Sequence, residues 1–113
     1  MTHYSKELQE HSALLGLMPA LESVIIQAAQ MIAESIRNGG KLLLVGNGGS
    51  AADCQPLAAE IIGRCINDRR ALPAIALTVD SSALTCVAND YDYVFSRQVE
   101  GLANKGDALI AIS

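Results

Sequence analysis

The chain has 113 residues, of which 50% are hydrophobic and 18% are charged, and its formal net charge at pH 7 is −4. This length suits one globular domain that is just long enough to bury a core, and it excludes a pair of domains. The acidic balance and the absence of a run of Lys or Arg argue against a surface dedicated to nucleic acid.

Two helices are predicted before the first strand. Residues 5–15 form the first, which should break at residues 16–19. Residues 20–37 carry apolar side chains at intervals of three and four, which predicts an amphipathic helix that ends at residues 38–40. Its apolar stripe indicates either core or a subunit interface, and its length on so small a domain favours the interface.

Strands and helices alternate in the rest of the chain. The expected elements are a strand at 41–45, a helix at 51–64, a strand at 74–77, a helix that Ser81 or Ser82 caps and that runs through 87, a turn at Asn89 and Asp90, a helix at 94–103 and a strand at 108–112. Because a helix separates each pair of strands, the strands should pair in parallel, as in an α/β protein.

The most informative segment is GNGGSAAD, residues 46–53, which follows the apolar run LLLV. Gly46, Gly48 and Gly49 can adopt a positive φ, which lets the backbone approach a ligand closely. Ser50 can cap the following helix. This arrangement aims helix-start amides at an anion and predicts phosphate recognition. The alternatives are a tight turn with no ligand and a dinucleotide site, whose pattern is met only in its loosest form.

The three cysteines form no CxxC pair. Cys54, Cys65 and Cys86 are predicted to be reduced thiols that are mostly buried. The polar N-terminus lacks the apolar core of a signal peptide, and no apolar stretch is expected to approach the length of a membrane span. We therefore expect a cytoplasmic protein with no membrane partner.

Several motifs together resemble one family. The run KLLLVGNGGSAADCQPLAAEIIGR, the ND turn and the run VFSRQVE are similar to the sugar isomerase (SIS) domain, and within it to sedoheptulose 7-phosphate isomerases. The resemblance implies an α/β fold with a three-layer open parallel sheet of the SIS, flavodoxin-like, type. Residues 1–40 would be N-terminal helices for oligomerisation, and residues 41–113 the first half of the SIS domain. The sheet is expected to be truncated after the third strand.

The same resemblance implies a function. Family members are cytoplasmic homotetramers that convert sedoheptulose 7-phosphate to glycero-manno-heptose 7-phosphate for lipopolysaccharide core and other heptose glycans. This chain is expected to be a partial or altered member. The alternative is a non-catalytic SIS module that binds a sugar phosphate or a replication-initiator protein.

The resemblance also assigns site residues. The residues that would bind the sugar phosphate are Asn47, Gly48, Gly49, Ser50, Asn89, Asp90 and Ser113. Glu60 matches the catalytic Glu, and a carboxylate suits the transfer of a proton between C1 and C2 through an enediol. Because it lies within an apolar helix face, Glu60 is expected to be a partly buried carboxylate.

The family's zinc site is altered in this sequence. The family helix usually reads QHFAAE, and its His and Glu bind zinc in many members; here the stretch is QPLAAE, with Pro56 in place of the His. Glu60 is the one ligand that remains, so zinc binding through the usual pair is not expected. Pro56 should also cost about 3 kcal/mol unless the helix kinks or starts late.

Overall fold

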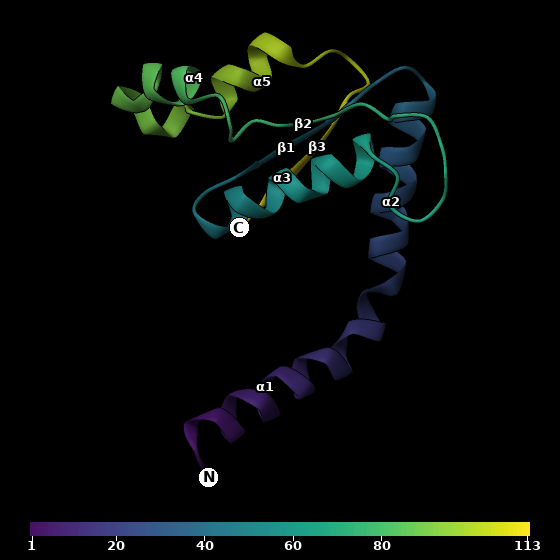
Figure 1. The fold of residues 1–113 in the computed structure, drawn as a ribbon, viewed down its shortest axis with the longest axis vertical. Helices are drawn as coiled ribbons and strands as arrows, with labels where there is room; N and C mark the ends of the chain where they lie inside the picture. Colours follow the sequence, from purple (N-terminus) through teal and green to yellow (C-terminus); the bar gives the residue numbers. More distant parts are fainter. The chain divides into compact units, whose positions relative to one another are not determined.

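The computed structural model describes residues 1–113 and contains a three-stranded parallel sheet with helices (Figure 1). The elements are α1 His3–Leu17, the 3-10 helix η1 Met18–Leu21, α2 Glu22–Arg37, β1 Leu42–Gly46, α3 Gly49–Ile62, β2 Ala74–Ala76, α4 Ser81–Cys86, the 3-10 helix η2 Ala88–Tyr93, α5 Ser96–Leu102 and β3 Ala108–Ile112. The chain forms two compact units, Met1–Met31 and Ile32–Ser113, which divide inside α2. The predicted order of elements is confirmed.

The first helices are continuous rather than interrupted. The expected break at residues 16–19 is instead the 3-10 helix η1, which carries Pro19 in its first turn and leads directly into α2. The segment His3–Arg37 therefore contains an 18-residue window of mean hydropathy 1.5, none of it buried, and the expectation that no apolar stretch reaches membrane length was wrong. Helices of soluble proteins and signal sequences have the same length and composition, so this segment alone does not indicate a membrane protein.

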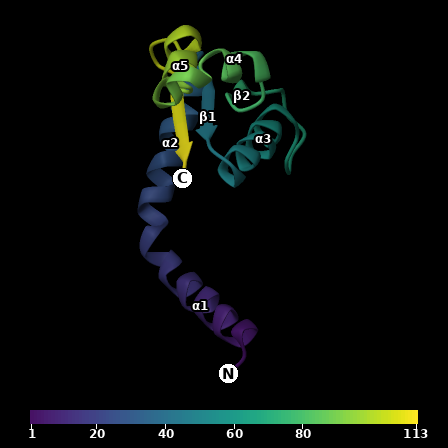
Figure 2. The same cartoon turned by 90° about the vertical axis from the view of Figure 1, so that its left-hand side faces the viewer.

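The sheet has the order β2-β1-β3, and β1 pairs in parallel with both neighbours. Gly46 at the end of β1 pairs with Ile112 at the end of β3. Figure 2 shows β1 and β3 side by side and pointing the same way, with the C-terminus at the tip of β3. The carboxyl ends of both strands therefore meet at one edge of the sheet, where ligands of open parallel sheets bind.

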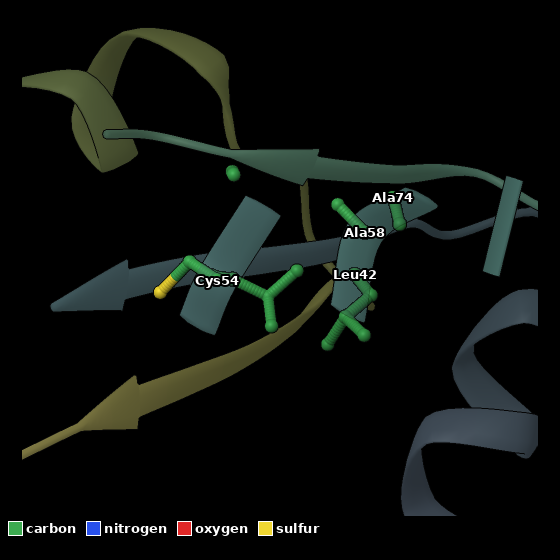
Figure 3. Packing of buried hydrophobic residues seen from close by; sticks show 6 residues of the cluster. Leu42, Cys54, Ala58 and Ala74 are labelled. Carbon is green, nitrogen blue, oxygen red and sulfur yellow. The ribbon is translucent and has the colours of Figure 1, made fainter. Parts of the chain in front are cut away.

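β1 is buried along its whole length, as a central parallel strand should be. On one face of the sheet, Leu42 packs in a cluster with Cys54 and Ala58 of α3 (Figure 3). On the other face, Leu43 packs in a second cluster with the partly buried Val99 of α5. Helices on both faces of the sheet give the three layers expected from the sequence.

Two predictions about side chains were wrong in this part of the fold. Of the three free cysteines, only Cys54 is buried, because Cys65 follows the end of α3 and Cys86 ends the short α4. Neither Ser81 nor Ser82 caps α4. The N-cap is Asp80, whose carboxylate accepts a hydrogen bond of 2.9 Å from the Ala83 amide.

An ion pair joins the amino ends of β1 and β3. The Lys41 Nζ lies 2.6 Å from the Asp107 Oδ2, and the Lys41 amide donates to the Oδ1 at 2.9 Å. The Asn104 amide also donates to this carboxylate, at 2.7 Å, and the Asp107 side chain is only 6% exposed. These donors, above all the Lys41 ammonium, lower the pKa of Asp107 from its ordinary 3.8 to about 2.

This shift predicts an acid-sensitive contribution to stability. Because the pKa of Asp107 is lower in the folded state, the contribution is present above pH 3.8 and is lost as the pH falls toward 2. We expect Asp107→Asn to lower the melting temperature at pH 7, with the difference from wild type shrinking through that window. Asp68→Asn, at an exposed ion pair with Arg64, is the control and should change little. Parallel pH profiles for wild type and Asp107→Asn would contradict the prediction.

Candidate functional site

The loop after β1 contains two positions where the geometry favours glycine, Gly46 and Gly48. A Cβ on Gly46 would lie 2.9 Å from the Ser50 Cβ and 3.0 Å from the Ile112 carbonyl oxygen, so a side chain does not fit there. Gly48 has a φ of +57°, which strongly favours glycine. Gly46 and Gly49 have no positive φ, so the sequence prediction holds for one glycine of the three.

α3 starts without a side-chain cap. Its N-cap is Gly48, and Ser50 lies inside the first turn, so the predicted role of Ser50 as the cap was wrong. The Asn47 carbonyl accepts hydrogen bonds from the Ser50 amide at 3.0 Å and the Ala51 amide at 3.3 Å. The Ala52 amide donates to the Gly48 carbonyl at 3.2 Å, so the amides of Gly48 and Gly49 are the ones without an acceptor at this end of the helix, where the positive end of the helix dipole lies. This end of α3 is therefore suited to an anion.

A pocket of about 330 Å³ lies at the carboxyl edge of the sheet. It is lined by Val45, Gly46, Asn47, Ser50, Phe95, Ala111, Ile112 and Ser113. Three polar side chains, those of Asn47, Ser50 and Ser113, thus share one pocket at the start of α3. Amide and hydroxyl donors beside a helix N-terminus are the chemistry that binds phosphate oxygens.

The structure does not bring all the predicted site residues together. Gly48, the N-cap of α3, and Gly49, its first residue, do not line the pocket. Asp90 lies in η2 and lines a second pocket, of about 390 Å³, with Tyr93, Ser96 and Arg97 among its other residues. Asn89, next to it, is exposed and lines neither pocket.

Glu60 lies in the last turn of α3 and is exposed, so the expectation of a partly buried carboxylate was wrong. The reason is helical periodicity: Cys54 and Ala58 face the sheet, and a residue two positions after Ala58 points away from it. The Glu60 carboxylate lies beside the Cys65 thiol and raises the pKa of that thiol. Glu60 thus lies on the surface at the end of α3, with the Cys65 thiol as a neighbour.

The residues present do not fit the family's zinc site. No group of three or more His, Cys, Asp or Glu side chains converges anywhere in the structure. Pro56 is exposed on α3, four residues before Glu60, where it offers no ligand atom. α3 nevertheless runs unbroken from Gly49 to Ile62 through Pro56, so the helix does not start late to avoid it.

Sequence reasoning missed Phe95. This side chain, the one Phe of the chain, lines the pocket with Asn47 and Ser113 and also packs against the cluster around Leu43. The sequence feature that could have identified Phe95 as a site residue is its place in the run VFSRQVE, directly before α5. An aromatic ring at this position gives the pocket one apolar wall.

Comparison with known proteins matches residues 3–113 to the family described as SIS domain. The chain is 53% identical over 112 residues to a phosphoheptose isomerase of Campylobacter concisus, which covers 97% of this chain and 56% of that protein. It is 52% identical over 116 residues to a phosphoheptose isomerase of Nitratiruptor sp., with 100% and 62% covered.

Two solved structures share the fold. The phosphoheptose isomerase of Neisseria gonorrhoeae matches with a TM-score of 0.79 and 39% identity over 99% of this chain and 61% of that chain. The enzyme of Francisella tularensis matches with a TM-score of 0.85 and 31% identity over 100% and 62%. The chain therefore spans about six tenths of the length of these relatives.

The effect of Pro56 on the stability of the protein can be tested by substitution. Proline at this position removes the helical hydrogen bond to the Ala52 carbonyl. Because the ring is exposed, Pro56→Ala should restore the bond without opening the core and raise the free energy of unfolding by up to about 3 kcal/mol. Urea unfolding measures this, with the exposed neighbour change Gln55→Ala as control. A less stable Pro56→Ala protein would contradict the account.

Proposed function

This chain belongs to the SIS-domain family, and on that premise we propose that it binds the phosphate of a sugar phosphate at the start of α3 and acts as a phosphoheptose isomerase. The reaction is the interconversion of sedoheptulose 7-phosphate and glycero-manno-heptose 7-phosphate, a step toward heptose glycans such as lipopolysaccharide core. The observation that carries the proposal is the pocket where Asn47, Ser50 and Ser113 meet.

Phosphate binding is supported by both strand ends that form the pocket. β1 supplies the glycine loop and the uncapped start of α3, and β3 supplies Ser113. Because the chain is acidic overall, a diffuse positive surface does not explain anion binding. Phosphate binding would therefore depend on the hydrogen-bond donors at the start of α3, and such a site needs no lysine.

In the proposed reaction, Glu60 is the base. A carboxylate removes the proton from C1 of the ketose, an enediol forms, and the proton returns at C2 to give the aldose. Ser50 and Glu60 are ten residues apart on α3, about 15 Å along the helix axis. A ligand held by its phosphate beside Ser50 must therefore extend along α3 to bring a carbon toward Glu60. Glu60 does not line the pocket, and a seven-carbon chain comes closer to covering this distance than a three-carbon chain does.

A second candidate is sugar-phosphate binding without turnover. The exposure of Glu60 and the lack of a ligand atom at Pro56 favour it, because both bear on the catalytic end of the site and leave the phosphate pocket unchanged. The two candidates share the pocket and differ only at Glu60.

Turnover separates them. We expect the protein to convert sedoheptulose 7-phosphate to the aldose, and Glu60→Gln to lower kcat by at least about 100-fold, the usual contribution of a general base. Triose phosphates should not be converted. Glu34→Gln, an exposed carboxylate of α2, is the control. Equal turnover of Glu60→Gln and wild type would exclude Glu60 as the base, and binding with no turnover by wild type would favour the second candidate.

We also propose that the first helices form a subunit interface in a cytoplasmic homotetramer. α1, η1 and α2 carry many exposed apolar side chains, among them Leu14, Leu17, Leu21, Val24, Ile25 and Met31. Exposed apolar side chains in this number on consecutive helices are typical of a surface covered by another chain.

The interface predicts an assembly. Light scattering should give a mass of four times 11.9 kDa. Val24→Asp should shift it toward the monomer, because a buried interface penalises an unpaired charge. Gln27→Asp, at a polar position of the same helix, should have a smaller effect. A monomeric wild-type protein would overturn this proposal.

A further inference from the structure

The end of α3 is held by one arginine from the following loop. The Arg69 guanidinium donates from Nη2 to the Glu60 carbonyl at 2.9 Å and from Nη1 to the Ile61 carbonyl at 2.9 Å. Nη1 also lies 3.1 Å from the Arg70 carbonyl. One planar side chain thus binds two consecutive carbonyls of the helix and one of its own loop.

These carbonyls are the ones that need partners. The last four carbonyls of an α-helix have no intrahelical donor, and a cation there also opposes the negative end of the helix dipole. The Gly63 amide closes on the Ala59 carbonyl at 2.8 Å, and the Leu72 amide reaches the Ile61 carbonyl at 3.3 Å. The Glu60 carbonyl has Arg69 as its partner beyond the helix.

We propose that Arg69 is a positioning residue for Glu60: by binding the carbonyls of Glu60 and Ile61, it fixes the last helical turn and with it the direction of the Glu60 side chain. The inference rests on the proposed function, because it takes Glu60 as the base. Glu60 is exposed and its carboxylate lies beside the exposed Cys65 thiol, so burial does not hold the side chain. The hydrogen bonds from Arg69 to the Glu60 and Ile61 carbonyls constrain the backbone from which this side chain starts.

The neighbouring Arg70 provides a matched control. Arg69 is half-buried, whereas Arg70 is exposed and makes one long hydrogen bond of 3.4 Å, to the Ala71 carbonyl. Arg70→Gln removes the same charge from the same loop without touching α3. Arg69→Lys keeps the charge but lacks the planar fork that binds two carbonyls at once.

Hydrogen exchange tests the hold on the helix independently of catalysis. In Arg69→Gln the Gly63 amide should exchange roughly tenfold faster, the equivalent of one lost hydrogen bond to a charged donor, while the Ala58 amide stays protected. Arg69→Lys should lie between wild type and Arg69→Gln, and Arg70→Gln should match wild type. Unchanged exchange of Gly63 in Arg69→Gln overturns the inference.

Kinetics test the effect on Glu60. Arg69→Gln should lower kcat for sedoheptulose 7-phosphate by about 10-fold to 100-fold, as a misplaced catalytic group does, while KM stays within about twofold. Arg69→Lys should recover part of the loss. Full kcat in Arg69→Gln, when Glu60→Gln is inactive, overturns the positioning role and leaves the proposed function standing. Full kcat in Glu60→Gln instead overturns the proposed function, while the exchange result still decides whether Arg69 holds the turn.

Discussion

The pairing of β1 with β3 is the constraint on which the site depends. Five residue pairs fix their register, and the last of them sets Gly46 beside Ile112. A Cβ on Gly46 would lie 3.0 Å from the Ile112 carbonyl oxygen and 2.9 Å from the Ser50 Cβ, so a larger residue there would have to shift β3 or the start of α3. The same register brings Ser113 to the loop that starts α3. One contact between two backbones thus joins both halves of the pocket.

The ends of the sheet are stabilised by different means. At the amino edge, the Lys41–Asp107 ion pair and the 2.5 Å hydrogen bond from the Ser35 hydroxyl to the Gly106 carbonyl satisfy polar groups within the chain. At the carboxyl edge, the start of α3 has no side-chain cap. The interactions at the amino edge therefore stabilise the pairing of the strands. At the carboxyl edge, the hydrogen-bond donors at the start of α3 are available to a ligand. This division is typical of open parallel sheets.

The sequence predicted the fold well because its signals are local and agree with one another. The apolar run of β1, the glycines after it and the 3.6-residue period of α2 each indicate their element directly. The cap of α4 at Asp80 and the exposure of Cys65 were missed, since both depend on where a short loop ends. For Glu60, an apolar sequence neighbourhood was mistaken for burial, although its helical position turns it from the sheet.

The central claim is that the carboxyl ends of β1 and β3 bind a phosphate. Nuclear magnetic resonance titration with sedoheptulose 7-phosphate tests it most directly, with unphosphorylated sedoheptulose as control. The account predicts that the phosphorylated sugar changes the amide chemical shifts most at residues 46–50 and Ser113. The control sugar should leave the chemical shifts of these amides unchanged. Changes confined to η2, around the pocket that contains Asp90, or no changes with the phosphorylated sugar, would contradict it.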